Sequence, residues 1–392
     1  MFKSRQSHYI HLDLILILLF FIVISLLGIH NAQQLGQYPD NFVLKQLVFY
    51  SLGIGLALVI QFIDLEQLYK SSFYLYLLGV LSLIVLHFSP VAIAKPVNGA
   101  KSWFNNKVPF ISIQPSEFAK IFFILFLAYI IYRHQQKFTQ QTLTSDLWLI
   151  AKILITTIVP ALFIFKQPDL GTTLVFVFIA GILFILSGVD WKLIAVILVT
   201  GISAVTAAVL LIVNFPDFSQ EVLKIEPHQI NRVLTWFDPS SQDSDDRYHL
   251  ELSLLTVGSG QLSGKGMNSA QVQIPEAHTD FIFAIIGESF GFIGAAIVIL
   301  VFFLFLYRLV TLGMKSAQFS PYASYVCYGF MALILFHTFQ NIGMTIGIMP
   351  ITGIPLLFIS YGGSTTLSTM MMYGIIYRIA TEQSKQESFL FN

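Results

Sequence analysis

Residues 271–294 read QVQIPEAHTDFIFAIIGESFGFIG and pass from a polar segment into an apolar run that continues to Tyr307. Asp280 is therefore expected where water meets hydrocarbon. A carboxylate at the edge of a bilayer is costly, and an ionisable residue there is a functional hypothesis by default. Helical periodicity places Asp280 on one face with Gly287 and turns Glu288 roughly 80° away. Because that glycine face suits close helix packing, Asp280 is predicted to point toward packed protein and not toward lipid.

The composition is that of an integral membrane protein. Hydrophobic residues make up 56% of the chain and charged residues 11%, with a mean hydropathy of +0.76, so a soluble fold would lack polar surface to cover itself. The formal net charge is zero, which gives no electrostatic case for binding nucleic acid. Cys327 is the single cysteine, so neither a disulfide framework nor a thiol metal cluster is expected.

Runs of about 17 to 25 apolar residues predict an all-α, polytopic membrane protein with about ten transmembrane helices in one domain, residues 1–392. An even number of spans places both termini on the same side of the membrane. The predicted spans lie near residues 12–29, 42–63, 71–89, 116–132, 147–165, 171–187, 192–213, 280–307, 321–346 and 350–378.

The distribution of Lys and Arg between the connecting segments predicts the orientation. With the N-terminus inside, the inner segments carry ten of these residues and the short outer segments carry four. Because positive charge accumulates in cytoplasmic loops, both termini are predicted to be cytoplasmic. Two large outer loops then remain, near 90–115 and 214–279. Within the second, the glycine-rich turn 258–266 is interpreted as a flexible connector. A phosphate cradle is the less favoured alternative, because the turn lacks the sequence context of a nucleotide-binding loop.

Further candidate site residues lie in the first outer loop and at the start of the fourth span. Glu117 and Lys120 are three residues apart and can pair on one helical face. A self-neutralised helix start explains them equally well, but they are expected on the same side of the membrane as Asp280. Trp103 is either a member of the interfacial aromatic belt or a ligand-binding residue.

Two other segments combine proline, glycine and polar residues. Asp169, in the turn 166–172, is interpreted as a turn or helix-cap residue. The last predicted span is interrupted between residues 349 and 364 by two prolines and several glycines. Broken helices at membrane depth are tolerated only where they are buried or line a cavity, so this segment is predicted to wall a cavity near Asp280.

Five motifs extend over nearly the whole chain, namely GAKSWF (99–104), QPSEFAK (114–120), QPDLGT (167–172), PEAHTDFIFAIIGESFGFIG (275–294) and NIGMTIGIMPITGIPLLFISYGGS (341–364). On these motifs the chain resembles the SEDS family (shape, elongation, division and sporulation) of bacterial cell-wall polymerases. QPSE and QPDLGT favour the rod-shape branch of the family over the division branch, and the sporulation branch stays open.

The resemblance implies a peptidoglycan glycosyltransferase that polymerises lipid II on the outer face of the bacterial cytoplasmic membrane. It implies that Asp280 is the essential catalytic residue, that Glu117 and Lys120 line the same cavity, and that Trp103 lies beside it. It also implies a class B penicillin-binding protein as partner, together with lipid II and membrane lipids, and a divalent cation, Mg²⁺ or Mn²⁺, as cofactor.

The chemistry of that reaction agrees with the residues. A sugar hydroxyl attacks an anomeric carbon that carries a polyprenyl diphosphate, so one general base suffices, and Asp280 is predicted to supply it. Lys120, Lys101 or a divalent metal could balance the charge of the diphosphate. The chain has no Walker motif, and an activated lipid substrate needs no nucleotide.

Two alternatives compete with the enzyme. The first is a flippase or transporter of lipid-linked precursors, in which Asp280, Glu117 and Lys120 would form a proton or substrate path. The second is a scaffold for a transpeptidase, which would leave the interfacial carboxylate unexplained. The gathering of ionisable residues at the outer face, with large outer and short inner loops, favours the enzyme.

Overall fold

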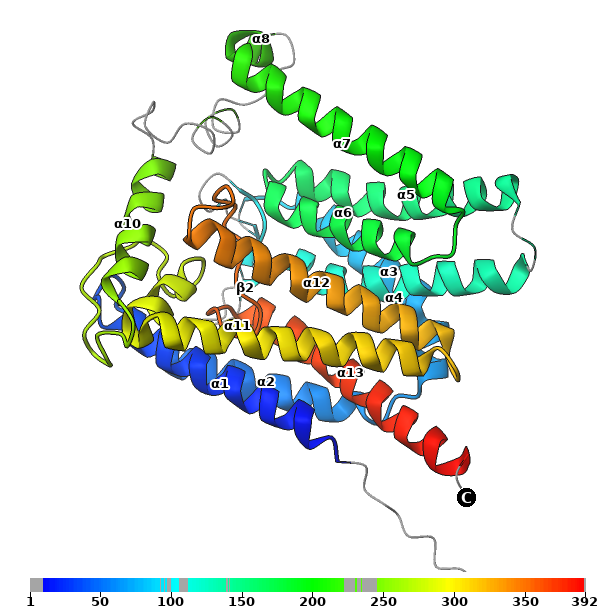
Figure 1. Ribbon diagram of the computed structural model, residues 1–392, viewed down its shortest axis with the longest axis horizontal. Coiled ribbons are helices and arrows are strands. Elements are labelled where there is room, and N and C mark those ends of the chain that lie inside the picture. Colours follow the sequence, from blue (N-terminus) through cyan, green and yellow to red (C-terminus); the bar gives the residue numbers. More distant parts are fainter. Residues whose placement is uncertain are drawn as a thin grey trace, which may run out of the picture.

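The computed structural model describes residues 10–91, 93–94, 96, 100–105, 112–138, 140, 142–221, 230, 234 and 245–390. Most of the described helices run roughly along one axis in an elongated bundle, and the helix over residues 245–259 stands across one end of it (Figure 1). The helices are α1 (Leu12–Gln33), α2 (Phe42–Ile60), α3 (Leu65–Phe88), α4 (Pro115–Lys137), α5 (Leu143–Phe165), α6 (Leu170–Ile185), α7 (Trp191–Asn214), α8 (Pro216–Glu221), α10 (Asp245–Ser259), α11 (Ile282–Ser316), α12 (Pro321–Thr345) and α13 (Gly363–Leu390).

The predicted helical, multi-pass architecture is confirmed. Eight of the described helices, α1 to α5, α7, α11 and α12, are long and apolar enough to cross a membrane. The shorter apolar α6 and the C-terminal α13 run beside them in the same bundle (Figure 1). Strand structure among the described residues is one antiparallel pair of two-residue strands, β1 (Phe104–Asn105) and β2 (Ser112–Ile113), between α3 and α4.

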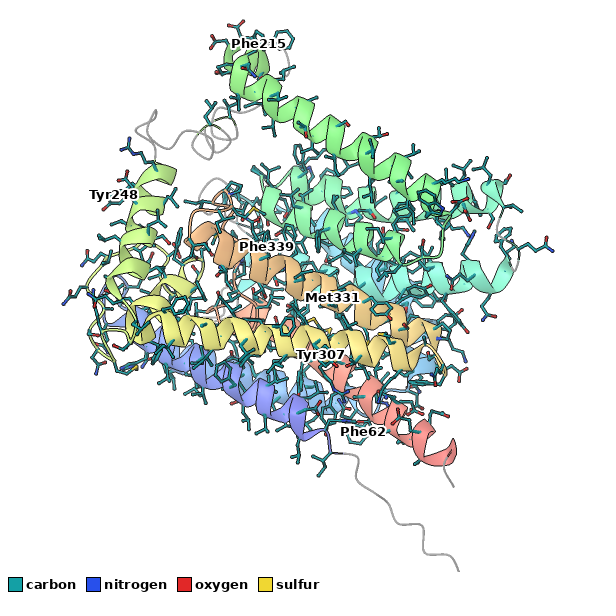
Figure 2. All side chains as sticks on the ribbon, in the orientation of Figure 1. Phe62, Phe215, Tyr248, Tyr307, Met331 and Phe339 are labelled. Atoms are coloured by element: carbon teal, nitrogen blue, oxygen red, sulfur yellow. The ribbon has the colours of Figure 1, made fainter. Side chains whose placement is uncertain are left out.

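The helices turn large apolar side chains outward, as lipid-facing helices do. Phe62, Tyr307 and Phe339 project from the surface of the bundle, and the ring of Phe62 is 87% exposed (Figure 2). A soluble protein would not expose so many large apolar side chains to water. This surface is therefore suited to contact with the hydrocarbon of a bilayer.

Helices α4 and α12 form the centre of the bundle. In the most apolar stretch of α12, more than two thirds of the residues are buried inside the protein. In the corresponding stretch of α4, about two thirds are buried. Helix α7 is the opposite case, because none of its residues is buried, and it lies along one edge of the bundle (Figure 1). The residues of α4 and α12 are therefore the ones placed to hold buried polar groups.

Both described ends of the chain lie at the same end of the bundle. Asp13 near the start of α1 pairs with Arg308 at 2.6 Å, and Glu387 near the end of α13 lies 3.5 Å from Lys315. Arg308 and Lys315 belong to the C-terminal part of α11, so its N-terminus and the turn that carries Asp280 lie at the opposite end (Figure 1).

The last span differs from its predicted bounds. It was expected over 350–378, but residues 351–362 are not helical, and α13 begins at Gly363. Side chains from neighbouring helices satisfy its backbone: Ser25 of α1 donates to the Ile359 carbonyl at 2.7 Å, and Tyr50 of α2 donates to that of Phe358. Within this irregular segment, residues 346–362, Ile354 and residues 356–360 are buried in protein, the condition under which non-helical backbone is tolerated at membrane depth.

The glycine-rich turn 258–266 is not the flexible connector that was expected. Its backbone pairs with α11, since Lys265 donates to the carbonyl of Glu288 at 2.9 Å and Phe292 donates to that of Gln261 at 2.9 Å. A Cβ at Gly264 would lie 2.2 Å from the carbonyl oxygen of Ser289, so only glycine permits this approach. The pairing accompanies a kink in α11, at which the φ of Gly291 is +66°.

Candidate active site

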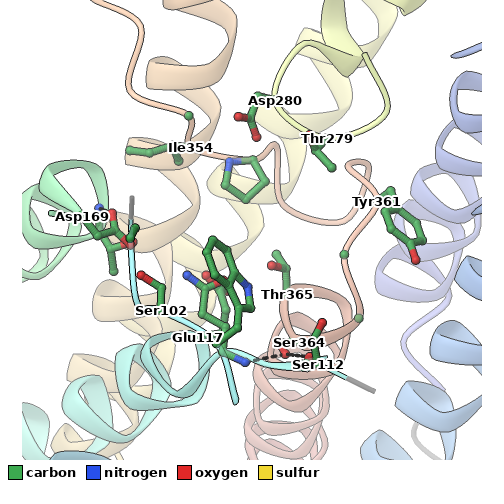
Figure 3. A pocket seen from close by; sticks show the side chains of 18 of the residues that line it. Ser102, Ser112, Glu117, Asp169, Thr279, Asp280, Ile354, Tyr361, Ser364 and Thr365 are labelled. Carbon is green, nitrogen blue, oxygen red and sulfur yellow. Dashed lines mark hydrogen bonds between the residues drawn. The ribbon is translucent and has the colours of Figure 1, made fainter. Parts of the chain in front are cut away.

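A cavity of about 450 Å³ opens at the end of the bundle that lies opposite the two termini. Figure 3 shows Asp280, Asp169, Glu117 and Tyr361 arranged around it. Its walls come mainly from helix ends and connecting segments, namely residues 100, 102, 103, 112, 114, 117, 168–170, 172, 279, 280, 352–355 and 361–365. The prediction that the irregular segment walls a cavity near Asp280 is confirmed.

Asp280 reaches this cavity from a turn and not from a helix. The periodicity that placed it on one face with Gly287 does not apply, because α11 begins at Ile282 and residues 275–281 form turns. The N–H of Asp280 donates to the carbonyl of Glu276 at 3.1 Å, which closes the turn. Its carboxylate is half-buried and lies beside Gly353, where a Cβ would approach Oδ2 to 3.2 Å.

The environment of Asp280 favours its protonated form. Burial raises the pKa of its carboxyl group to about 7, and the negative charges of Glu276 and Asp169 act in the same direction, whereas a hydrogen bond from Thr279 opposes them. A carboxylate with a pKa near physiological pH can accept a proton and release it again, which is what general-base catalysis requires.

The predicted pairing of Glu117 with Lys120 is present. The Lys120 ammonium donates to Oε1 of Glu117 at 2.8 Å, and both residues are almost fully buried, at 2% and 3% exposed. Glu117 lines the cavity, whereas Lys120 lies behind it in α4. Ser368 of α13 donates to the other carboxylate oxygen of Glu117 at 3.4 Å. This second bond helps to satisfy a carboxylate that has been removed from water.

His337 of α12 also belongs to this site, and the sequence reading did not select it. It lines the cavity, is 1% exposed, and its Nε2 lies 3.2 Å from the Lys120 ammonium. A lone histidine inside an apolar helix carries little signal, because most such residues are core residues. Only the four-residue spacing from Asn341, which places two polar groups on one helical face, pointed to a buried polar site.

Asp169 combines the predicted cap role with a place in the cavity wall. Its Oδ1 accepts from the N–H of Thr172 at 2.9 Å and caps α6, and its Oδ2 accepts from the Thr172 hydroxyl at 2.8 Å. Burial raises the pKa of the Asp169 carboxyl group, and the bonds from Thr172 partly offset this. Asp169 is therefore the third carboxylate in the lining of the cavity, beside Asp280 and Glu117.

The two predicted site residues between α3 and α4 lie in different places. Trp103 lines the cavity, whereas Lys101 is not among the lining residues. The Lys101 ammonium donates to the carbonyl of His87 at 3.1 Å and to that of Ser89. The expectation that Lys101 supplies a cation to the cavity is corrected, because the negative C-terminal end of α3 holds its charge instead.

Hydroxyl groups make up much of the remaining wall. Ser112, Ser364 and Thr365 lie on one side of the cavity (Figure 3), and Ser102 and Thr352 also line it. The hydroxyls of Ser102 and Thr352 are buried and have no hydrogen-bond partner among the described residues. A wall of neutral donors and acceptors suits a polar, hydroxyl-rich or phosphate-bearing ligand better than an apolar one.

Comparison with known proteins decides the family. The family model described as cell cycle protein, which groups FtsW, RodA and SpoVE, matches residues 5–385. The chain belongs to this family. A probable peptidoglycan glycosyltransferase FtsW of Coxiella burnetii is 32% identical over 357 residues, which cover 90% of this chain and 89% of the relative.

Solved structures of similar fold agree with the assignment to the FtsW/RodA/SpoVE family. A chain of a peptidoglycan synthase complex, described for its coordination of polymerization and crosslinking, superposes with a TM-score of 0.75 and 24% identity over 96% of this chain and 99% of that one. The rod shape determining protein RodA of Thermus thermophilus gives a TM-score of 0.67 and 22% identity over 96% and 98% of the two chains. At these identities the superpositions establish the fold.

Proposed function

We propose that this FtsW/RodA/SpoVE family protein is a peptidoglycan glycosyltransferase that polymerises lipid II into glycan strands at the outer face of the bacterial cytoplasmic membrane. The observation that carries the proposal is the Asp280 carboxyl group, which faces a polar cavity at one membrane surface with a pKa raised to about 7. The relatives named peptidoglycan glycosyltransferase support the reaction class.

Asp280 acts in this proposal as the general base. The ionised carboxylate takes the proton from a sugar hydroxyl of one lipid II molecule, and the oxygen attacks the anomeric carbon of the other. A new carbon–oxygen bond forms, the bond to the diphosphate breaks, and polyprenyl diphosphate leaves. Because the diphosphate is a good leaving group, the attacking hydroxyl is the group that most needs activation.

The leaving diphosphate needs positive charge, and two sources fit the site. The Lys120 ammonium is buried behind Glu117, so it contributes to the field of the cavity from beneath its wall. Asp280 and Asp169 are oxygen donors at the cavity, and a hard cation such as Mg²⁺ or Mn²⁺ is commonly held by one or two carboxylates together with substrate phosphates. When bound there, such an ion would neutralise charge on the diphosphate.

The orientation and the partner are part of the same proposal. The excess of Lys and Arg in the segments at the end that holds both termini supports cytoplasmic termini, which puts the cavity at the outer face. A class B penicillin-binding protein is the proposed partner, because a solved chain of the same fold belongs to a complex that couples polymerization to crosslinking.

We assign the protein to the RodA branch, with a role in cell elongation, on the motifs QPSEFAK and QPDLGT. The relative from Coxiella burnetii carries the name FtsW, which makes division the competing role. Depletion of the protein from the bacterium that produces it separates the two. Rounded cells support elongation, and long filaments without septa would assign the protein to division.

A flippase is the second candidate function, and the position of the cavity argues against it. A transport site is expected near the bilayer midplane, between two gates. The lining residues instead come mainly from the first turns of α4, α6 and α13 and from connecting segments, including the turn before α11, at one end of the bundle.

Purified protein in liposomes with fluorescent lipid II tests the proposal. With a divalent cation and no nucleotide, in the presence and absence of a class B partner, the native protein should produce glycan ladders that muramidase digests. Movement of lipid II between leaflets without any ladder would establish the flippase instead.

A further inference from the structure

Helix α12 holds the irregular segment 346–362 through three polar side chains near its outer end. The Nε2 of Gln340 donates to the Pro350 carbonyl at 2.8 Å. Asn341 and His337, four residues apart on one face of α12, bind carbonyl groups further along the segment. These bonds are the means by which a helix can fix non-helical backbone inside a membrane protein.

Asn341 makes the central contact of this group. Its side chain is fully buried, and its Nδ2 donates to the carbonyl of Asp280 at 2.7 Å and to that of Ile354 at 2.8 Å. Because both acceptors are carbonyl oxygens, the amide nitrogen must face them, and both of its hydrogens are used. One side chain therefore joins the backbone of Asp280 to the backbone of the irregular segment.

His337 extends the connection by one helical turn. Its Nδ1 lies 2.9 Å from the carbonyl of Pro355 and must be the donor of that bond, so Nε2 is left as an acceptor that faces the Lys120 ammonium at 3.2 Å. The ring is therefore neutral. The same face of α12 thus holds Asp280 through Asn341 and the buried ion pair through His337.

The irregular segment also covers the carboxyl group of Asp280. Gly353, next to the residue that Asn341 holds, has a φ of +67°, and a Cβ there would lie 3.2 Å from Oδ2 of Asp280. Burial is the largest cause of the raised pKa of Asp280. A displacement of the segment would admit water to this carboxyl group and remove that cause.

We propose that Asn341 is a positioning residue for Asp280: it fixes the Asp280 backbone and the cover formed by residues 353–355 with a single buried amide. The inference rests on the proposed function, since it assigns Asp280 the role of base. Asn341 touches no reacting atom, so its loss should lower kcat and leave KM nearly unchanged. It should also move the acid limb of the pH–rate profile to lower pH.

The test compares Asn341→Ala with Gln340→Ala in full-length protein. Gln340 is the matched control, because it is the neighbouring residue on α12 and holds a carbonyl of the same segment but does not contact Asp280. We expect Asn341→Ala to lower kcat for lipid II polymerisation by about 10- to 100-fold with a change in KM below about twofold. Gln340→Ala should stay within about threefold of the native kcat.

A second readout does not depend on activity. The folded pKa of Asp280 lies above its unfolded value, so ionisation destabilises the folded state. The gain in Tm from Asp280→Asn should grow between about pH 4, near the unfolded pKa, and pH 7, near the folded one, and stay constant above it. In the Asn341→Ala background the gain should level off at a lower pH.

The outcomes separate the two proposals. Two results would overturn the positioning role. One is an equal loss of kcat in Asn341→Ala and Gln340→Ala. The other is a Tm gain from Asp280→Asn that levels off at the same pH with and without Asn341→Ala. A native protein that makes no glycan under any condition would overturn the proposed function, while the stability readout would still decide the role of Asn341. If Asn341→Ala does not fold, Asn341→Ser, which keeps one donor, should show a smaller shift of the same sign.

Discussion

Glu117 and Asp280 are two carboxylates that face the same cavity from different elements, and they differ in their partners (Figure 3). Glu117 lies in the first turn of α4 with the Lys120 ammonium at 2.8 Å. Asp280 lies in a turn, near the like charges of Glu276 and Asp169, and burial raises its pKa to about 7. The ion pair with Lys120 gives Glu117 a structural role. Asp280 is not paired with Lys120, and its raised pKa gives it a proton affinity suited to catalysis.

The largest expected effect is the loss of the isolated carboxylate. Asp280→Asn keeps the size of the side chain and removes the base, so polymerisation should fall by about 10² to 10⁴-fold. Single-turnover polymerisation of fluorescent lipid II measures this loss. The size-exclusion profile and Tm serve as controls for folding. If folded Asp280→Asn protein polymerises lipid II at the native rate, another residue must be the base.

Removing the partner of the other carboxylate should affect stability first. Lys120→Met leaves Glu117 buried without its counter-charge, which costs on the order of 3–5 kcal/mol. Chemical unfolding in detergent measures the change. The double variant Glu117→Gln/Lys120→Met should recover most of that loss, since no uncompensated charge remains. Single and double variants of equal stability would show that the pair is not coupled.

Gly353 tests how closely the isolated carboxylate is covered. Gly353→Ala places a methyl group 3.2 Å from Oδ2 of Asp280 on a residue whose φ is +67°, so the segment must shift. A loss of roughly 1 kcal/mol in stability and about a tenfold loss in rate are expected. Gly55 of α2, with open space around it, is the matched control: Gly55→Ala should leave the rate unchanged and should not lower stability, because alanine favours the helix. Equal behaviour of the two variants would mean that the cover does not matter.

The smallest effect is expected at Lys101. Its ammonium caps α3 and does not line the cavity, so Lys101→Ala should cost less than about 1 kcal/mol and change polymerisation less than about twofold. The initial rate at saturating lipid II measures this directly. A much lower polymerisation rate in folded Lys101→Ala protein would indicate that Lys101 contacts the substrate.

The membrane spans were predictable because long apolar runs have few alternatives in a bilayer. For the last span, the prolines and glycines between residues 349 and 364 indicated an interruption, but the start of the helix at Gly363 did not follow, because residues 351–362 are held by side-chain donors on other helices. The pairing of Glu117 with Lys120 followed from helical spacing alone.

The rest of the site depends on contacts between distant segments. Asp169 reads as an ordinary cap, and its place at the cavity becomes visible only once α6 is packed in the bundle. His337 and Asn341 are isolated polar residues in an apolar run, with partners encoded elsewhere in the chain. Lys101 was misplaced because loop residues have no periodicity that fixes the direction of a side chain.

The pH dependence of polymerisation tests the central claim most directly. Under single-turnover conditions with saturating lipid II, the rate should rise with pH and reach half of its plateau near pH 7, because only ionised Asp280 accepts the proton. A rate that stays constant from about pH 5.5 to 8.5, in protein that remains folded, would contradict the assignment of Asp280 as the base.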